Sequence, residues 1–335
     1  MIQRTIPTWQ ELSWQEELQA LITQPEDLID YLQLDKSLLE AANKAHQLFP
    51  LRATMSFVSR IQKGDVNDPL LRQILPLEAE LHTPRDYSGD PLDEQHFNQH
   101  KGIVHKYHGR VLVIAATHCA INCRYCFRRE FDYSSNRLSR LDWHNVLDYI
   151  RQHSELSEVI LSGGDPLGLP DSTLSWLLGS LADIAHVQRI RVHSRFPIIL
   201  PSRITPELIT IFTQTRLQPV WVIHCNHARE LDASVKSALA RAATAGITLL
   251  NQSVLLKGVN DNTPALKDLS ERLFNHKVLP YYLHLLDKVS GASHFDLPEV
   301  HALSLYEELR SVLPGYLLPK LVREVAGDSA KRVIA

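Results

Sequence analysis

Three cysteines that lie close together in the sequence are the residues best suited to do chemistry. Cys119, Cys123 and Cys126 form a C-x3-C-x2-C pattern, and the fourth cysteine, Cys225, stands far from them. Three soft thiolates on one loop suit an iron–sulfur cluster or zinc. Structural zinc is usually closed by four ligands, whereas three cysteines on a four-iron cluster leave one iron open. We therefore predict a [4Fe-4S] cluster on these three cysteines.

The open iron defines the chemistry that such a cluster could perform. It can chelate the amino and carboxyl groups of S-adenosylmethionine, and an electron passed through it can break the sulfonium carbon–sulfur bond. Cluster potentials reach roughly −700 mV, which makes this reductive cleavage conceivable. The alternative is a structural zinc knuckle that borrows His118 or Cys225 as its fourth ligand.

Composition limits the partners of the chain. Asp and Glu number 38 against 35 Lys and Arg, so there is no positive field to attract nucleic acid. No stretch is apolar for long enough to span a membrane, and the polar start Met1-Ile2-Gln3-Arg4 lacks the apolar run of a signal peptide. Free thiolates suit a reducing compartment. We expect a cytoplasmic protein that binds neither nucleic acid nor membrane.

The elements before the cysteine loop fall into two segments. Residues 8 to 62 read as helical, with Trp14, Leu18, Leu21 and Ile22 on one face of an amphipathic pattern. Residues 64 to 108 are rich in Asp, Pro, Gly and His and have little periodicity. This second segment is expected to be an irregular linker that wraps around the unit that follows.

From residue 110 onward, short β-branched runs alternate with helical patterns. Six βα units in series predict a parallel sheet, either a full or partial (β/α) barrel or an open doubly wound sheet. Polar and glycine-bearing segments follow the strands, and ligands bind at this edge in both folds. The predicted strands are residues 111–115, 159–161, 190–193, 220–223, 247–256 and 281–286.

Several motifs in this region resemble those of one enzyme family. The cysteine loop after a first strand is similar to the radical S-adenosylmethionine superfamily, and the text from Cys123 to Phe131 resembles lysine 2,3-aminomutases. The similarity runs from about Lys106 to Lys331 and includes the segments Ser162 to Leu167 and Asn251 to Asp261. The text from His105 to Arg110 is most like the branch of the family whose (R)-β-lysine modifies elongation factor P.

The resemblance implies an α/β fold, a partial (β/α)6 radical-SAM barrel with an N-terminal helical extension. Its parts would be an N-terminal helical region at residues 1–63, an irregular wrapping linker at 64–108 and the barrel at 109–317. A C-terminal segment at 318–335 would carry a lysine that binds pyridoxal 5′-phosphate.

The resemblance also assigns residues to the cluster and its cosubstrate. The three cysteines would hold the cluster, and His224 would contact the adenosine. The segment Gly163, Gly164 and Asp165 would meet the methionyl amino group, since paired glycines let a ligand approach the backbone closely. By itself, the glycine segment would also fit a tight turn, and a lone histidine would fit a satisfied core residue.

A second cofactor follows from the chemistry of the family. Moving an amino group between adjacent carbons requires an intermediate that delocalises a radical, and an imine to pyridoxal phosphate provides it. By resemblance, Lys331 forms the resting Schiff base, and Asn251, Gln252 and Lys106 lie near the cofactor phosphate. Lys106 stands where an arginine is usual. Composition alone would not select Lys331, because a lysine near a chain end is usually solvated.

Three charged residues match family positions that hold an amino-acid substrate. Arg128 follows the last cysteine by two, and its planar guanidinium suits the α-carboxylate. Asp287 and Glu324 match two carboxylates that hold the distal ammonium of lysine, with Glu324 replacing the usual aspartate. Two acids would select lysine, since a neutral side chain would leave them buried and unpaired. A surface ion pair is the ordinary role of an arginine, and Arg129 fits it.

These assignments lead to one principal hypothesis and two alternatives. The principal one is an isomerase that converts free L-lysine into (R)-β-lysine with a [4Fe-4S] cluster, S-adenosylmethionine and pyridoxal 5′-phosphate. Its partners would be a reductant such as flavodoxin or ferredoxin and, functionally, elongation factor P and its lysine ligase. The alternatives are the same chemistry on another α-amino acid and a non-catalytic metal-binding scaffold for the machinery that modifies the translation factor.

Overall fold

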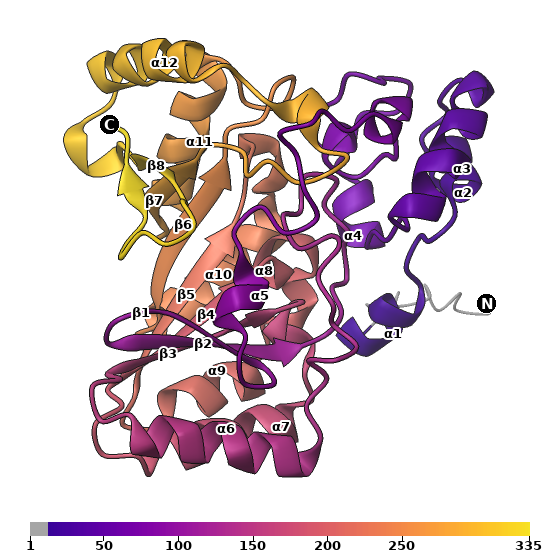
Figure 1. The fold of residues 1–335 in the computed structure, drawn as a ribbon. Coiled ribbons are helices and arrows are strands. Elements are labelled where there is room, and N and C mark those ends of the chain that lie inside the picture. Colours follow the sequence, from indigo (N-terminus) through magenta and orange to yellow (C-terminus); the bar gives the residue numbers. More distant parts are fainter. Residues whose placement is uncertain (1–12) are drawn as a thin grey trace, which may run out of the picture.

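The centre of the molecule is one curved sheet. The computed structural model describes residues 13–335, so the start of the predicted N-terminal helical region, with the Met1 to Arg4 text, lies outside the described residues. Within residues 13–335 the sheet has nine strands in the order β1 to β9 and does not close (Figure 1). Strands β2 to β8 are parallel, and β1 and β9 pair antiparallel at the two ends. This open sheet confirms the predicted partial barrel. The strands are β1 (Ile103–Tyr107), β2 (Arg110–Ala116), β3 (Glu158–Gly163), β4 (Arg189–Ser194), β5 (Gln218–His224), β6 (Thr248–Val254), β7 (Leu279–His284), β8 (Lys320–Arg323) and β9 (Arg332–Val333).

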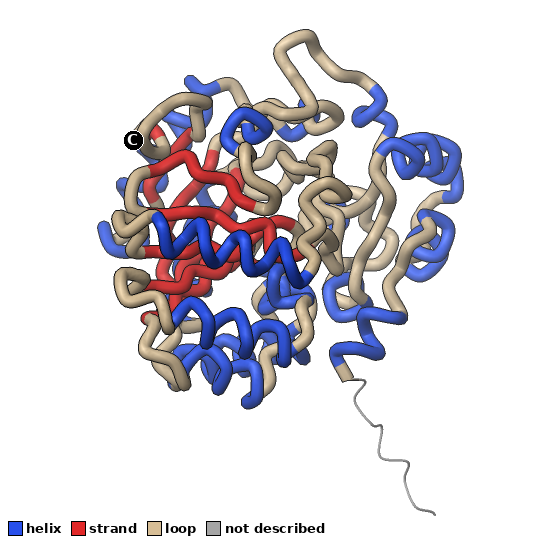
Figure 2. Tube along the Cα trace, turned by 60° about the horizontal axis from the view of Figure 1, so that its bottom comes forward, coloured by secondary structure: helices blue, strands red, loops and turns tan. Residues whose placement is uncertain are grey.

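Helices follow the parallel strands and flank the sheet, as the tube in Figure 2 shows. The described chain contains the six predicted βα units, from β2 with α6 to β7 with α12. In α6, Trp143, Val146, Leu147 and Ile150 are buried at the spacing that places them on one helix face. The helices of this part are α6 (Arg140–Gln152), α7 (Asp171–Ala182), α8 (Phe196–Ile199), α9 (Pro206–Thr213), α10 (Ala233–Thr244), α11 (Thr263–Asn275) and α12 (Glu299–Val312).

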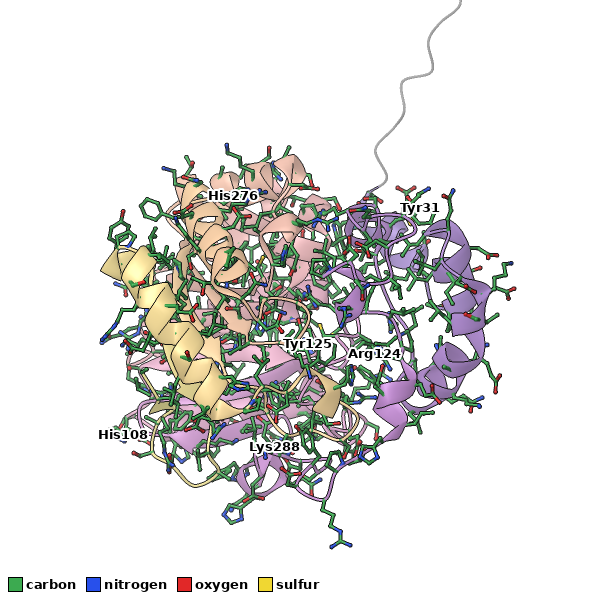
Figure 3. The ribbon with its side chains drawn as sticks, turned by 90° about the horizontal axis from the view of Figure 1, so that it is seen from above. Tyr31, His108, Arg124, Tyr125, His276 and Lys288 are labelled. Carbon is green, nitrogen blue, oxygen red and sulfur yellow. The ribbon has the colours of Figure 1, made fainter. Side chains whose placement is uncertain are left out.

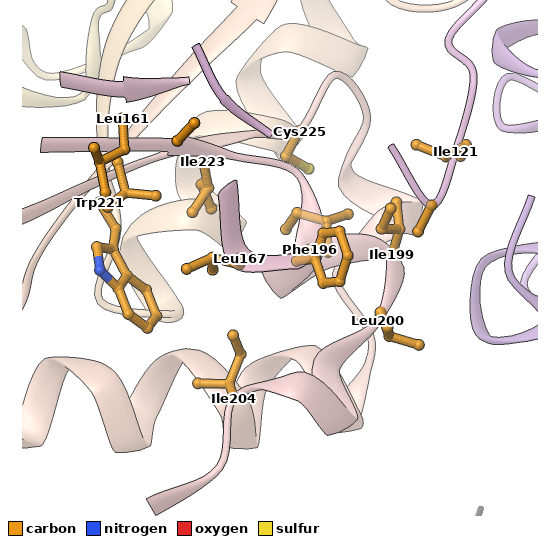
Figure 4. Packing of buried hydrophobic residues seen from close by; sticks show 14 of the residues in the cluster. Ile121, Leu161, Leu167, Phe196, Ile199, Leu200, Ile204, Trp221, Ile223 and Cys225 are labelled. Carbon is orange, nitrogen blue, oxygen red and sulfur yellow. The ribbon is translucent and has the colours of Figure 1, made fainter. Parts of the chain in front are cut away.

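The main hydrophobic core lies between the sheet and these helices. Leu161 and Ile223 from the strands meet Leu167, Phe196 and Ile204 from the following loops and helices (Figure 4). All of these side chains are fully or almost fully buried. Parallel strands are covered on both faces, which explains why they read as continuous apolar runs in the sequence.

The N-terminal helices are shorter than the amphipathic pattern suggested. They are α1 (Trp14–Gln19), α2 (Pro25–Tyr31), α3 (Leu39–Leu48) and α4 (Met55–Val58). Leu21 and Ile22 were expected on the face of one helix with Trp14, but α1 ends at Gln19 and Ile22 instead forms an isolated bridge with Ala53. A single helix could not in any case have continued into α2, because the residue before Pro25, Gln24, is held in an extended conformation.

Residues 64–102 run from the N-terminal helices across the loops of the barrel. This segment includes the short helix α5 (Glu94–Phe97), and Ser88 pairs with Val289 in an isolated parallel bridge. Strands β1, β8 and β9 were not among the predicted strands, and β1 falls within the predicted irregular linker. These three are short and partly exposed, so they lack the apolar alternation that marks the other strands. Across residues 13–335, no helix combines the length and the apolar character needed to cross a membrane.

Candidate active site

The predicted site residues gather at the carboxyl ends of the parallel strands. The cysteine loop follows β2, Gly164 and Asp165 follow β3, and Asp287 lies just beyond β7. His224 is the last residue of β5, and Glu324 comes directly after β8. Because all these strands point the same way, their ends share one edge of the sheet, as ligand-binding α/β folds require.

The cysteine loop is held by the N-terminal helices and the wrapping segment. Arg124, between the second and third cysteines, is fully buried and makes a bidentate ion pair with buried Glu80, at 2.8 Å from Nε and 2.6 Å from Nη2. It also donates to the carbonyl oxygen of Phe49. Figure 3 shows Arg124 on the side of the N-terminal helices and Tyr125 nearer to the barrel. Contrary to the surface role expected for Arg129, this residue is buried on the same glutamate, at 3.0 Å.

A second buried network contacts one of the cysteines directly. Arg195, at the end of β4, donates from Nη1 to the Cys123 sulfur at 2.7 Å. Its other terminal nitrogen contacts Gln73 Oε1 at 2.6 Å and Glu230 Oε2 at 3.2 Å. Sequence reasoning assigned no role to Arg195, although Ser194-Arg195 belongs to the text that resembles the family. The contact places the positive charge of Arg195 directly beside the Cys123 sulfur.

The paired glycines let β3 and the cysteine loop come together. The Gly164 amide donates to the carbonyl oxygen of Ala116 at 2.7 Å, and the next amide, of Asp165, donates to that of His118 at 2.9 Å. A Cβ on Gly163 would lie 2.4 Å from the Ala116 oxygen, and one on Gly164 would lie 2.4 Å from the His118 oxygen. In the described structure, the absent side chains therefore make room for the backbone of the cluster loop.

Replacing Gly164 by alanine is expected to displace the cysteine loop. The added Cβ meets backbone, which cannot rotate away, so overpacking should cost about 1–3 kcal/mol of unfolding free energy and lower the iron bound per chain. Chemical denaturation and iron content after anaerobic reconstitution measure the two effects. Gly179→Ala in α7 is the matched control, because among the described residues nothing lies within 4 Å of its Cβ. Equal iron content in both variants would contradict the role of Gly164 in making room for the cysteine loop.

Asp165 organises the neighbouring loop. Its carboxylate accepts hydrogen bonds from Ser194 Oγ at 2.7 Å and from the Arg195 amide at 2.6 Å, with further amides of Leu167 and Phe196 within 3.1 Å. Burial raises the pKa of Asp165 to about 6, and these hydrogen bonds oppose the rise. The carboxylate thus ties the end of β3 to the end of β4.

The thiols themselves are placed on one loop without a preset metal geometry. Burial raises the pKa of the Cys126 thiol to about 11 and that of Cys119 well above its usual value, so a metal would have to displace protons from these thiols. Across residues 13–335, no group of three or more His, Cys, Asp or Glu side chains has the arrangement of a metal site. Cys225 is buried and its sulfur contacts the His227 carbonyl oxygen, while His118 is exposed. A cavity of about 290 Å³ adjoins Cys119.

Arg128 follows the cysteine loop and is already paired in the structure. Its Nε and Nη2 contact the two carboxylate oxygens of Glu94 at 2.6 and 2.7 Å, and Nη1 donates to Ser162 Oγ at 3.1 Å. Both partners of the ion pair are more than nine-tenths buried. Sequence reasoning missed Glu94, because a single acid in an aperiodic segment carries no signal of its own.

The C-terminal segment brings Lys331 to the same edge. Strands β8 and β9 pair antiparallel, with Arg323 opposite Arg332, so the hairpin between them places Lys331 next to Glu324. The Lys331 ammonium forms an ion pair with Glu324 Oε2, and Lys106 Nζ lies 3.4 Å from the other oxygen. Glu324 and Lys331 are seven residues apart in the sequence, and they are in contact because the chain turns back between β8 and β9.

The two predicted substrate acids differ in charge state. Burial raises the pKa of Asp287 to about 7, and among the nearby charges Lys331 opposes the rise while Glu324 adds to it. Burial also acts to raise the pKa of Glu324, but its ion pairs with Lys331 and Lys106 outweigh burial and hold it at about 2. Near neutral pH the Asp287 carboxyl group is therefore partly protonated, whereas Glu324 is ionised.

Two of the predicted cofactor residues, His224 and Gln252, contact each other, and Asn251 is buried in a different contact. His224 Nε2 and the Gln252 side-chain nitrogen are 2.6 Å apart. Burial, and to a smaller extent the positive charges of Arg195 and Arg128, lowers the pKa of His224 to about 3, so this imidazole is neutral. Asn251 instead uses its amide on the backbone of Cys225, accepting at 2.9 Å and donating at 3.1 Å. Its predicted contact with a cofactor phosphate is untested, and its observed role is to join β5 to β6.

Comparison with known proteins identifies the family. No family model matches the chain. A protein named L-lysine 2,3-aminomutase from Haemophilus influenzae is 46% identical over 326 residues, which cover 97% of this chain and 96% of that protein. One of the same name from Escherichia coli is 45% identical, with coverages of 98% and 96%. The chain belongs to the L-lysine 2,3-aminomutase family.

The L-lysine 2,3-aminomutase family also includes more distant relatives. The protein of this name from Clostridium subterminale is 35% identical over 96% of this chain and 77% of its own length. Among solved structures, a radical SAM methyltransferase from Sphaerobacter thermophilus aligns with 66% of this chain and 68% of its own at 16% identity, with a TM-score of 0.45. The resemblance inferred from the motifs is confirmed, and so is the prediction of an isomerase that moves an amino group within its substrate. A non-catalytic scaffold is not supported.

Proposed function

We propose that this chain is a radical SAM, pyridoxal-phosphate-dependent aminomutase that converts free L-lysine into (R)-β-lysine. The observation that carries the proposal is the Lys331 ammonium held by Glu324, beside Asp287 and at the same edge as Arg128. A primary ammonium of the lysine type is thus already paired with one of these acids, and its charge acts on the other. A lysine substrate would present one such ammonium to the acids and one carboxylate to the arginine.

The residues around the cysteine loop fit a [4Fe-4S] cluster and S-adenosylmethionine. Three thiols come from one loop, the Arg195 guanidinium contacts the Cys123 sulfur, and the neutral imidazole of His224 would contact the adenosine. When bound, the cluster would supply the electron that cleaves S-adenosylmethionine and so generates the radical. Two buried arginine networks, on Glu80 and Glu230, hold that loop in place.

The residues near Lys331 fit pyridoxal 5′-phosphate. Lys331 is partly buried and lies on a hairpin, and Lys106 is 91% buried with its ammonium beside the Leu92 carbonyl oxygen. When bound, this cofactor would supply the electron delocalisation that amino migration needs. With Lys331 holding the cofactor, Glu324 would keep its ion pair with Lys106, and the ε-ammonium of the substrate would take the place of the Lys331 ammonium.

Free lysine is the proposed substrate, and a protein such as flavodoxin or ferredoxin the proposed reductant. The text from His105 to Arg110 supports the branch of the family that serves elongation factor P and its lysine ligase. The same chemistry on an α-amino acid without a distal ammonium would leave Asp287 and Glu324 without a function.

Anaerobic turnover of labelled lysine tests the proposal. With reductant, S-adenosylmethionine and pyridoxal phosphate, the wild-type enzyme should yield β-lysine and need all three. Cys123→Ala should abolish deoxyadenosine formation, because the cluster loses a ligand. Lys331→Ala should keep uncoupled deoxyadenosine formation while product falls by about 10³-fold or more, as expected when the covalent anchor is lost. Unchanged product from either variant would overturn the proposal.

A further inference from the structure

One buried acid at the site has no role in the proposed function. Glu94 is the first residue of α5, and its carboxylate takes the Nε and Nη2 edge of Arg128 at 2.6 and 2.7 Å. The side chains of the pair are 6% and 7% exposed. A carboxylate so deep in the protein is retained only when its hydrogen bonds and charge are matched, and Arg128 matches both. Asp90 in turn accepts from the Glu94 amide at 2.9 Å, which holds the start of α5 in place.

The pairing leaves part of the guanidinium free. Arginine has five N–H groups, of which Glu94 takes two and Ser162 Oγ takes one at 3.1 Å. Within the described chain, the other two N–H groups, one on each terminal nitrogen, have no protein acceptor. A second carboxylate can therefore reach Arg128 without displacing the first.

The surroundings of Arg128 do not fix its orientation without Glu94. The guanidinium carbon lies 4.9 Å from the centre of the Phe127 ring and 5.8 Å from that of Phe131, and these contacts tolerate rotation in the ring plane. Glu94 and Ser162 are the groups that define the plane of the fork. A planar fork recognises a carboxylate only when its direction is set in advance.

We propose that Glu94 is a positioning residue for the substrate, which holds Arg128 so that its two remaining N–H groups face the α-carboxylate of the amino acid. This inference rests on the proposed function, because it takes Arg128 as the carboxylate site. The inference also assigns a role to the wrapping segment, because Glu94 lies in α5 of that segment and not in the barrel. The opposite possibility is that Glu94 occupies the place of the substrate carboxylate and must leave before lysine binds.

The test compares lysine with pentane-1,5-diamine, which has both amino groups but no carboxylate. Dissociation constants are measured by calorimetry on the cofactor-loaded enzyme, for wild type, Glu94→Gln and Glu94→Asp. The glutamine variant should bind lysine about 10- to 100-fold more weakly, because it loses the charge and one of the two bonds that orient the arginine. Its affinity for the diamine should stay within about twofold. Glu94→Asp, which keeps the charge but is shorter, should fall between wild type and the glutamine variant.

Controls separate a local effect from general damage. Asp148→Asn removes an exposed ion pair with Arg151 within α6, and should change neither constant. Equal weakening of lysine and diamine binding by Glu94→Gln would mean structural damage and overturn the inference, as would unchanged or tighter lysine binding. If the wild-type enzyme binds lysine but does not convert it, the proposed function fails while the binding data still decide the role of Glu94.

Discussion

Asp287→Asn is expected to make the protein more stable at pH 8 and nearly inactive on lysine. Burial raises the pKa of Asp287 to about 7, so at pH 8 the folded protein carries an ionised carboxylate in surroundings that disfavour its charge. Asparagine removes this charge at similar volume. Activity should fall by about 100-fold or more, because one of the two acids for the substrate ammonium is lost.

The pH dependence of stability identifies the cause. The folded-state pKa of Asp287 lies above its ordinary value of 3.8, so the folded state binds the proton more tightly than the unfolded state. Below about pH 4 the carboxyl group is protonated in both states and has no effect. Between about pH 4 and 7 the wild type loses stability as pH rises, and above 7 the loss is complete. The gain from asparagine should therefore be absent at pH 4 and reach about 1–3 kcal/mol at pH 8.

Two measurements check this expectation. Chemical denaturation at pH 4.5 and pH 8 should show a stability difference between variant and wild type only at the higher pH. For the wild type, kcat/KM for lysine should rise with pH through about 7, as Asp287 ionises and can pair with the ammonium. Asp268→Asn serves as a control, because Asp268 is exposed and pairs with Arg272 within α11. A pH-independent stability change in Asp287→Asn would refute the electrostatic explanation.

Glu80→Ala should have the largest effect on folding. Glu80 is fully buried and pairs with Arg124 at 2.6 Å and with Arg129 at 3.0 Å, so its loss leaves two buried guanidinium groups without their acid. Breaking one buried ion pair in this way typically costs about 3–5 kcal/mol. Because Arg124 lies between Cys123 and Cys126, we also expect the cysteine loop to lose its anchor and the enzyme to lose iron.

The measurement pairs denaturation with iron content after anaerobic reconstitution. Glu78→Ala, two residues away on the exposed side, should stay within about 0.5 kcal/mol of wild type and keep its iron. A Glu80→Ala variant that denatures like wild type would show that the two arginines find other partners. A variant that is destabilised but binds full iron would separate the folding role of Glu80 from the ordering of the loop.

Some features of this protein follow from local sequence alone. The cysteine loop, the six βα units and the position of the polar residues after the strands could all be predicted, because each depends on spacing within a few residues. The apolar stripe of α6 and the cap at Thr205 are further examples of such local patterns. The carboxyl ends of parallel strands must share one edge, so convergence of the site needed no further information.

Lys331 required more than local pattern. Its type and place near the chain end suggest a solvated residue, and only resemblance to the family singled it out. The tertiary structure supplies the physical reason, since the β8 and β9 hairpin returns Lys331 to Glu324. The hairpin itself is short and partly exposed, and therefore carries no strand signal.

The ion-pair partners were decided by the tertiary structure alone. Glu94 reaches Arg128 across 34 positions of sequence, Glu80 reaches Arg124 across 44, and Arg195 reaches Cys123 across 72. Glu80 and Glu94 stand in an aperiodic segment where no spacing distinguishes a buried acid from a solvated one. Sequence determined which residues can ionise or bind metal. Only the path of the folded chain determined which of them are buried together, because the low polarity of the interior makes each buried charge depend on its particular partner.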